Sequence, residues 1–197
     1  MADAAPVKWG ILGCGDVCEI KSGPALQDAA NSELVAVMRR SPGAAEDFAA
    51  RHNVAAFFTD AEALAASEDV TAIYVASPPA AHFEHAAIAC AAGKPTYIEK
   101  PLGRNVGESQ KIVDMFEAAG VPLFVAYYRR GLAPFTVAKE IIASGEIGAP
   151  VTVSFRLDQR PNAAVSTPRN PHRNLIFRVR SPTDILPVKL LITMRCR

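Results

Sequence analysis

The feature that most constrains the fold is a regular alternation of short apolar runs with alanine-rich segments over the first 150 residues. The apolar runs are bounded by glycine, proline or charged residues, and β-branched residues are frequent in them, as is typical of buried strands. The segments between them carry helix-forming residues and helix stop signals. This alternation predicts an α/β fold, a doubly wound and mostly parallel sheet that is covered by helices on both faces.

Six strands are expected in this sheet. They are predicted at 7–12, 34–38, 56–58, 71–77, 95–99 and 122–127. Helices are predicted at 42–53, 80–95, 105–120 and 135–148, together with a helical segment after the first strand. The helix at 135–148 is expected to be closed by Gly145 or Gly148. Asn105 is expected to cap the helix at 105–120 and Gly120 to end it. A further strand at 150–157 alternates apolar and polar residues, which is typical of an antiparallel sheet and indicates the start of a second domain.

The first expected strand runs into a glycine loop with the pattern G-x-G-x-x-C, formed by Gly13, Gly15, Asp16, Val17 and Cys18. In a Rossmann-type fold the first glycine allows the tight turn, and the second lets the backbone approach a pyrophosphate. The helix that follows offers its N-terminal N–H groups to the phosphates. Cysteine replaces the usual third glycine here and is small enough for the helix to pack on the strand. An ordinary glycine turn is the alternative interpretation.

The end of the second expected strand carries arginines where an NAD-binding unit would have an acidic residue. Arg39 and Arg40 stand at this place, followed by Ser41. A guanidinium can bind the 2′-phosphate of NADP(H) with two hydrogen bonds, whereas a carboxylate would repel it. NADP(H) is therefore favoured over NAD(H), with a pair of solvated arginines as the alternative.

The segment "YIEKPLG" (97–103) places a charged pair at the carboxyl end of the fifth expected strand. Ligands of open parallel sheets bind beyond these strand ends. A ketone that becomes an alkoxide needs a positive donor near its oxygen, and Lys100 can supply one. Pro101 biases the backbone of Lys100 toward an extended conformation, which helps to fix the side chain. A solvated Glu99–Lys100 pair at a strand end is the alternative.

Three segments together resemble the Gfo/Idh/MocA family of NAD(P)-dependent oxidoreductases: "ILGCGDV", "VASPPAAHFEHAAIACAAGKPTYIEKPLG" and "YYRRGLAPFTVAKEIIASGEIGAPVTVSF". The resemblance covers about residues 7–157, and the E-K-P motif is its most specific part. It implies a Rossmann domain followed by an α/β domain with a large open antiparallel sheet. That sheet forms a wall of the substrate pocket and often the interface of a homo-oligomer. The family acts mostly on sugars, inositols and related polyols or diols, so the implied partners are a nicotinamide dinucleotide and a small polyhydroxylated substrate.

The resemblance also implies roles for particular residues. Lys100 matches the family's catalytic lysine, which lies beside the nicotinamide and helps to polarise the substrate oxygen. Ser77, Pro78 and His82 match a loop that runs past the cofactor, and Tyr127 and Arg130 match the end of the sixth strand. The residues predicted to bind the cofactor are Gly13, Gly15, Asp16, Val17, Arg39, Arg40, Ser41, Ser77, Pro78, His82, Glu99, Lys100 and Arg130.

A metal site is not predicted. His82 and His85 are three residues apart on an expected helix, so their rings could face one another. Two such ligands without a nearby cysteine or second acidic partner do not make a metal site. His82 is expected near the cofactor, and His85 is expected to be structural.

The resemblance ends near Leu157, and a basic tail follows. Residues 159–197 hold eight Lys or Arg and one Asp, a net charge of +7, whereas the rest of the chain carries −6. The family's downstream motif is an Asp followed four residues later by His or Tyr, after a glycine-rich stretch. It is not found in this sequence, because His172 lacks such a context and Asp184 is followed at 188 by valine.

Three segments are therefore expected: a Rossmann domain at 1–128, the start of a truncated substrate and oligomerisation domain at 129–157, and an irregular basic tail at 158–197 that is disordered or unrelated to the family. Alternative splicing, a frameshift or a gene-model error is the simplest origin of the tail, and docking on an acidic partner is the alternative. Two functions remain open: an NADP(H)-dependent oxidoreductase represented by its cofactor half, or a non-catalytic nucleotide-binding fragment.

The overall composition excludes several other classes of function. The net charge of +1 gives no case for binding nucleic acid or an anionic membrane. No run of 18 apolar residues is present, and the first residues do not have the pattern of a secretory signal. Four cysteines without a CxxC pair favour a reducing compartment, so a cytoplasmic location is expected.

Overall fold

The computed structural model describes residues 5–148, 153–154 and 178–179. The chain divides into two compact units, Met1–Tyr127 and Tyr128–Arg197, and each is described by itself.

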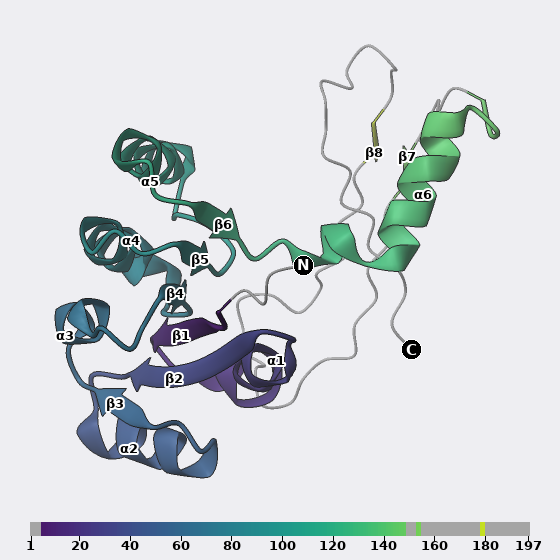
Figure 1. The fold of residues 1–197 in the computed structure, drawn as a ribbon. Coiled ribbons are helices and arrows are strands. Elements are labelled where there is room, and N and C mark those ends of the chain that lie inside the picture. Colours follow the sequence, from purple (N-terminus) through teal and green to yellow (C-terminus); the bar gives the residue numbers. More distant parts are fainter. Residues whose placement is uncertain (1–4, 149–152, 155–177, 180–197) are drawn as a thin grey trace, which may run out of the picture. The chain divides into compact units, whose positions relative to one another are not determined.

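The first unit is built on one six-stranded sheet (Figure 1). Its strands are β1 (Val7–Leu12), β2 (Ser32–Met38), β3 (Ala56–Phe58), β4 (Ala72–Val75), β5 (Thr96–Ile98) and β6 (Leu123–Val125). Their order is β3-β2-β1-β4-β5-β6, and every neighbouring pair is parallel. The expected Rossmann-type sheet is thus confirmed, and the order reverses between β1 and β4, where such sheets bind ligands.

Helices connect these strands. They are α1 (Gly23–Asp28), α2 (Pro42–Arg51), α3 (Ala61–Ala66), α4 (His82–Ala91) and α5 (Val106–Ala119), with a π-helical turn, η1 (Cys18–Ser22), before α1 and a 3-10 turn, η2 (Pro79–Ala81), before α4. The sequence did not predict α3, because six residues are too few to show a helical period. Its start is nevertheless fixed locally, since the Asp60 side chain accepts a hydrogen bond from the Ala63 N–H at 2.8 Å.

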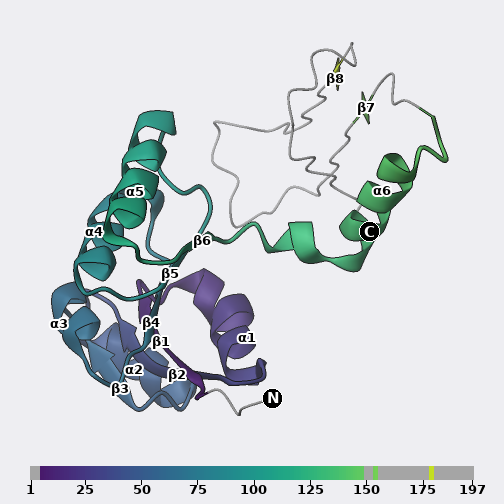
Figure 2. The same cartoon turned by 45° about the horizontal axis from the view of Figure 1, so that its top comes forward.

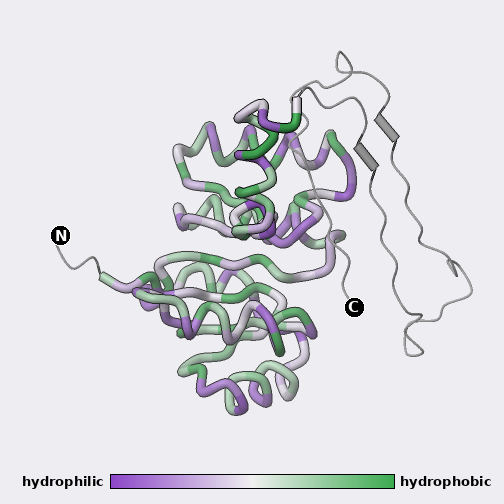
Figure 3. Tube along the Cα trace, turned by 90° about the vertical axis from the view of Figure 1, so that its right-hand side faces the viewer, coloured by the Kyte–Doolittle hydropathy of each residue, from purple (hydrophilic) through white to green (hydrophobic). Residues whose placement is uncertain are grey.

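Helices cover both faces of the sheet (Figures 1 and 2). Helices α3, α4 and α5 lie side by side on one face, whereas α1 lies on the other. Two buried clusters match this arrangement: one joins the sheet to Leu64, Ile112 and Phe116, and the other joins it to Cys18 and Phe48. Figure 3 shows hydrophobic and hydrophilic stretches alternating along the helices, as one-sided packing on a sheet requires.

Helix α5 follows its sequence signals closely. The Asn105 side chain caps the helix by accepting a hydrogen bond from the Glu108 N–H at 2.9 Å. Ile112 and Phe116 point into the core and are buried. Gly120 ends the helix in the left-handed conformation, with φ of 65°, which glycine adopts at little cost.

The second unit contains a 3-10 turn, η3 (Tyr128–Gly131), helix α6 (Ala133–Ser144) and a short antiparallel pair, β7 (Val153–Ser154) with β8 (Arg178–Val179). Helix α6 ends at Gly145, one of the two glycines expected to close it, which adopts a left-handed conformation with φ of 76°. The strand expected at 150–157 is described only at β7. Apart from β8, the tail expected at 158–197 lies outside the described residues. Within the described part of the chain, no helix is long and apolar enough to cross a membrane.

The core beneath α5 gives the first prediction. Phe116 is 1 % exposed, so Phe116→Ala removes a large buried ring and leaves a cavity. We expect the free energy of unfolding of the first unit to fall by about 3–5 kcal/mol, measured by denaturant titration. Val106→Ala, at an 84 % exposed position of the same helix, is the control and should change stability by less than about 0.5 kcal/mol. Similar losses in both variants would contradict the packing described.

Candidate functional site: a cleft at the carboxyl edge of the sheet

The parallel strands deliver their following loops to one edge of the sheet. Backbone hydrogen bonds continue the pairing past the strand ends, from Gly13 N to Met38 O at 3.0 Å and from Ala76 N to Leu12 O at 2.9 Å. Glu99 N donates in the same way to Val75 O at 2.9 Å. The loops that follow β1, β2, β4 and β5 therefore lie next to one another.

A cleft of about 1060 Å³ opens along this edge, above the ends of β1, β2, β3 and β4. Nine of the residues predicted to bind a cofactor line it: Gly13, Gly15, Asp16, Val17, Arg39, Arg40, Ser41, Ser77 and Pro78. These residues come from three separate loops. The cleft thus brings together side chains and backbone groups that lie more than sixty positions apart in the sequence. Its volume suits a ligand of small-molecule or cofactor size.

The two glycines of the first loop have different geometric roles. Gly13 has φ of +89°, and a Cβ there would lie 2.6 Å from the Ser77 Cα. Only glycine therefore allows the loop after β1 to pass against the loop after β4. A Cβ on Gly15 would have no atom within 4 Å, so its backbone faces open space in the cleft. These are the features that a phosphate-binding loop of this kind requires.

The segment after the glycine loop is helical from Asp16 and passes through η1 into α1. Cys18, which stands in the place of the usual third glycine, is fully buried. Burial raises the pKa of its thiol to about 11, so it packs as a small neutral group. Close packing one turn later depends on Gly23 instead, because a Cβ there would collide with the Cys18 carbonyl oxygen.

Arg39 and Arg40 lie at the end of β2 and are exposed at the rim of the cleft. The backbone N–H of Arg39 donates to Phe58 O at 3.1 Å, which fixes the chain as it leaves the strand. Neither guanidinium takes part in an ion pair within the described part of the chain. Both positive charges are therefore free to meet an anionic group of a ligand.

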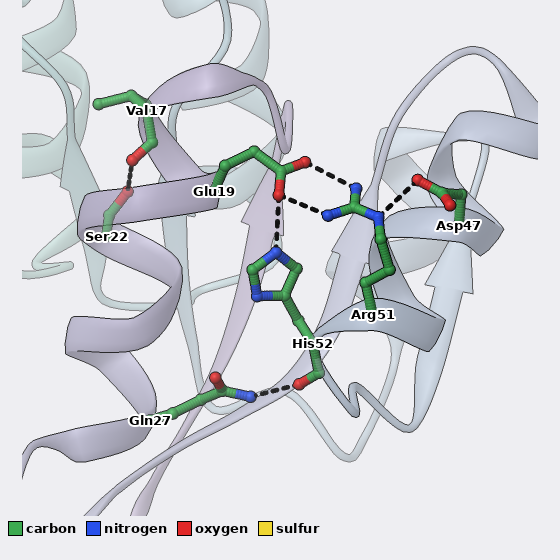
Figure 4. Close-up of polar contacts among 7 residues, drawn as sticks. All are labelled: Val17, Glu19, Ser22, Gln27, Asp47, Arg51 and His52. Atoms are coloured by element: carbon green, nitrogen blue, oxygen red, sulfur yellow. Dashed lines mark hydrogen bonds and ion pairs between the residues drawn. The ribbon is translucent and has the colours of Figure 1, made fainter.

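A charged network ties the helical segment after the glycine loop to α2 (Figure 4). Glu19 accepts hydrogen bonds from both terminal nitrogens of Arg51 at 2.7 and 2.8 Å, and its carboxylate lies 2.8 Å from His52 Nε2. Arg51 Nε also donates to Asp47 at 2.8 Å, and the ring of His52 stacks on Phe48 at 4.2 Å. The network therefore joins η1, which follows the glycine loop, to α2, which follows the Arg39–Ser41 rim.

Lys100 lies beyond the end of β5, one strand away from Ser77, and does not line the cleft itself. Its side chain is 61 % exposed, whereas that of Glu99 is 13 % exposed. Lys100 Nζ lies 3.8 Å from Glu99 Oε2. The Lys100–Pro101 peptide bond is cis.

The two histidines of α4 have different surroundings. His82 is 1 % exposed, with Nε2 at 2.8 Å from Ser77 O and Nδ1 at 2.9 Å from Pro101 O. These two contacts join the loops after β4 and β5, and His82 is not among the residues of the cleft wall. His85 lines the cleft, and burial lowers the pKa of its ring. Contact of His82 with a cofactor stays a prediction.

Arg130, also predicted to bind the cofactor, is exposed in η3 of the second unit. Among the described residues, no group of three or more His, Cys, Asp or Glu side chains could hold a metal ion.

The sequence reasoning missed one wall of the cleft. Thr59, Asp60 and Glu62 line it after β3, as do residues from the start of α4. The signal was available, because Thr59 directly follows a strand that was predicted at 56–58 and whose end lies on the same edge. A second hollow, of about 620 Å³, lies between α3 and α4 on a helical face. It lacks the converging strand-end loops, and its Lys94 Nζ already donates to Ser67 O at 2.6 Å.

The fold is that of a Rossmann-type α/β domain, with a cleft at its topological switch point. Residues 7–127 match the model of the oxidoreductase family with an NAD-binding Rossmann fold, GFO_IDH_MocA. The chain belongs to this Gfo/Idh/MocA family, as its E-K-P motif and glycine loop indicated.

Relatives agree with this assignment, and a solved structure shares the fold. The chain is 42% identical over 156 residues to "Oxidoreductase P35" of Formosa agariphila, and this match covers 79% of this chain and 49% of that protein. It is 37% identical over 113 residues to a scyllo-inositol 2-dehydrogenase (NADP(+)) of Bacillus subtilis, covering 57% of this chain and 34% of the relative. The scyllo-inositol dehydrogenase of Lactobacillus casei, solved with NAD(H) and scyllo-inositol, shares the fold with a TM-score of 0.69 at 21% identity, over 77% of this chain and 46% of that one. The chain spans about half the length or less of these proteins.

The Glu19 network predicts a pH-dependent contribution to stability. Arg51, and after it His52, lower the pKa of Glu19 from 4.5 to about 2. The folded state thus favours the carboxylate, and its contribution is full above pH 4.5 and is lost as the pH falls toward 2. We expect Glu19→Gln to lower the free energy of unfolding by about 1 kcal/mol at neutral pH, because the pair is partly exposed.

Denaturant titrations across this pH range measure the effect. The difference between wild type and Glu19→Gln should shrink as the pH falls below 4.5. Asp47→Asn is the matched control, since Asp47 is 61% exposed and makes a single bond to Arg51, and it should change stability less. A difference that is constant with pH would contradict the network.

Proposed function

We propose that the cleft binds NADP(H) and that the chain is the cofactor-binding part of an oxidoreductase that acts on a sugar-, polyol- or diol-like substrate. The observation that carries the proposal is the convergence of the glycine loop, the Arg39–Ser41 rim and the Ser77–Pro78 loop on one cleft. Each supplies what one part of a dinucleotide needs: N–H groups for the phosphates, cations for a 2′-phosphate, and a wall toward the strand that carries Lys100.

The preference for NADP(H) is supported by charge. Two guanidinium groups with no ion pair in the described residues stand where an NAD-specific unit has a carboxylate. The Bacillus subtilis relative is named for NADP(+), whereas the Lactobacillus casei structure holds NAD(H), so the family uses both cofactors and the arginines favour one.

The chemistry of the reaction is supplied by the nicotinamide, which exchanges a hydride with the substrate carbon. The role proposed for this chain's own residues is orientation and charge. Lys100 is exposed at the strand end beside Ser77, and its ammonium can donate a hydrogen bond to a substrate oxygen as negative charge develops there. The polyhydroxylated substrate class is inferred from the family and from the inositol dehydrogenases among its relatives.

Titration with NADPH and NADH, followed by turnover assays on a panel of sugars, inositols and diols, tests the proposal. NADPH binding with turnover supports the oxidoreductase. Binding without turnover by this chain supports the alternative, a nucleotide-binding fragment. Failure to bind either dinucleotide would refute both functions.

Arg39→Asp should reverse the cofactor preference. The variant removes a cation from the cleft rim and adds a carboxylate that accepts hydrogen bonds from a ribose 2′-hydroxyl. We expect NADPH to bind at least about tenfold more weakly, the loss of one charge-assisted hydrogen bond, while NADH binding is kept or improved. Lys111→Glu is the charge-change control, because Lys111 is exposed on α5 and away from the cleft. An unchanged NADPH/NADH ratio in Arg39→Asp would refute the role of this arginine.

Gly15→Ala separates binding from folding. The added Cβ meets no protein atom within 4 Å, so the stability of the domain should be kept. It occupies the space proposed for the pyrophosphate, and NADPH affinity should fall by about tenfold or more because phosphate N–H bonds are charge-assisted. Gly43→Ala, also without a neighbour within 4 Å but outside the cleft wall, is the matched control and should bind NADPH normally. Equal NADPH affinity in both variants would place the phosphates elsewhere.

A further inference from the structure

A buried tyrosine reaches the charged pair at the end of β5. Tyr74 is the third residue of β4, is 1 % exposed, and pairs in register with Tyr97 of β5. Glu99 lies two residues beyond Tyr97, on the same face of the sheet. The Tyr74 hydroxyl donates a hydrogen bond to Glu99 Oε1 at 2.8 Å. The phenol thus satisfies its buried polar end with a carboxylate rather than with a backbone group.

The Glu99 carboxylate is held at both oxygens. Oε1 accepts from Tyr74, and Oε2 accepts from the backbone N–H of Lys100 at 3.0 Å. The Glu99 side chain is 13 % exposed, so few water molecules can compete for its carboxylate oxygens. Burial is the largest cause that raises the pKa of Tyr74. Hydrogen bonding with Ser22 lowers this pKa and the Glu99 carboxylate raises it, and the net shift is upward, so the phenol stays a hydrogen-bond donor.

Lys100 is close to this carboxylate but does not form a short hydrogen bond with it. Its Nζ lies 3.8 Å from Oε2, within the range of an ion pair and beyond hydrogen-bond length. The ammonium therefore feels the negative charge without a short hydrogen bond to the carboxylate, which leaves its three N–H donors for other partners. Since the lysine side chain is 61 % exposed, those donors can reach a ligand.

We propose that Tyr74 is a positioning residue that holds the Glu99 carboxylate at this distance and so keeps the N–H donors of Lys100 available to a substrate oxygen. Without the hydroxyl, Glu99 swings onto Nζ and forms a direct hydrogen bond that occupies one donor. The inference deepens the proposed function and rests on it for the role of Lys100, whereas the geometry of the triad can be tested without turnover.

Competitive acylation of lysines tests the triad directly. The folded, cofactor-free chain is treated with a trace of acetic anhydride, and mass spectrometry gives the rate at Lys100 relative to Lys111 in the same molecules. In Tyr74→Phe the relative rate should fall, because a closer carboxylate favours the unreactive ammonium form of Lys100. A fall of about twofold to fivefold corresponds to the usual strength of an exposed ion pair. In Glu99→Gln it should rise, and in the double variant it should equal that of Glu99→Gln.

Tyr74→Phe keeps the volume of the ring, and its circular dichroism and unfolding midpoint check that the domain is intact. An unchanged Lys100 rate in a folded Tyr74→Phe would overturn the proposal, as would a further change on adding Tyr74→Phe to Glu99→Gln. Glu99→Gln is an independent check, because an unchanged rate in that variant would also overturn it.

The turnover assay provides a second arm. With a substrate identified from the panel, Tyr74→Phe should lower kcat while the KM for NADPH is unchanged, and an unaltered kcat would count against the positioning role. Absence of NADPH binding or of turnover in wild type would refute the proposed function instead, and the acylation ratio would still decide whether Tyr74 controls the pair.

Discussion

The parallel pairing of β1 with β2 on one side and β4 on the other decides where the glycine loop, the Arg39–Ser41 rim and the Ser77–Pro78 loop lie. Backbone N–H groups of Gly13 and Cys14 both donate to Met38 O, so the glycine loop is fixed to the strand end that carries the arginines. Gly13 allows the same loop to press against Ser77. Main-chain contacts therefore place three sides of the cleft: the glycine loop, the end of β2 and the Ser77 loop.

The order of strands and helices was largely predictable from the sequence, because each strand coincides with a short apolar run. All six strands overlap their predicted ranges, and the strand-helix alternation leaves a doubly wound sheet as the natural solution. The ends of the last three strands were placed one or two residues too late, as at 71–77 against Ala72–Val75. The chain keeps a backbone hydrogen bond to the neighbouring strand just past these ends, as Ala76 N does to Leu12 O, so the transition to a loop is gradual. The short helix Ala61–Ala66 was missed because its stability comes from packing on the sheet and from the Asp60 cap.

The site was predictable where a motif fixes backbone geometry and less so where side chains decide. Gly13, Gly15 and the loop at Ser77 lie where the sequence placed them. The contacts of the two histidines of α4 could not be predicted from their spacing, since positions three residues apart on one helix share a face. Only the packing shows that His82 bonds to loop carbonyls. The bond from Tyr74 to Glu99 joins two strands and leaves no local signature in the sequence.

The central claim is that the cleft above the strand ends is a dinucleotide site. Titration of the ¹⁵N-labelled chain with NADPH, followed by backbone amide resonances, tests it most directly. The account predicts that the largest saturable shifts fall on Gly13–Val17, Arg39–Ser41 and Ser77, with small shifts along α5. Shifts confined to the hollow between α3 and α4, or no shifts at millimolar NADPH, would contradict it.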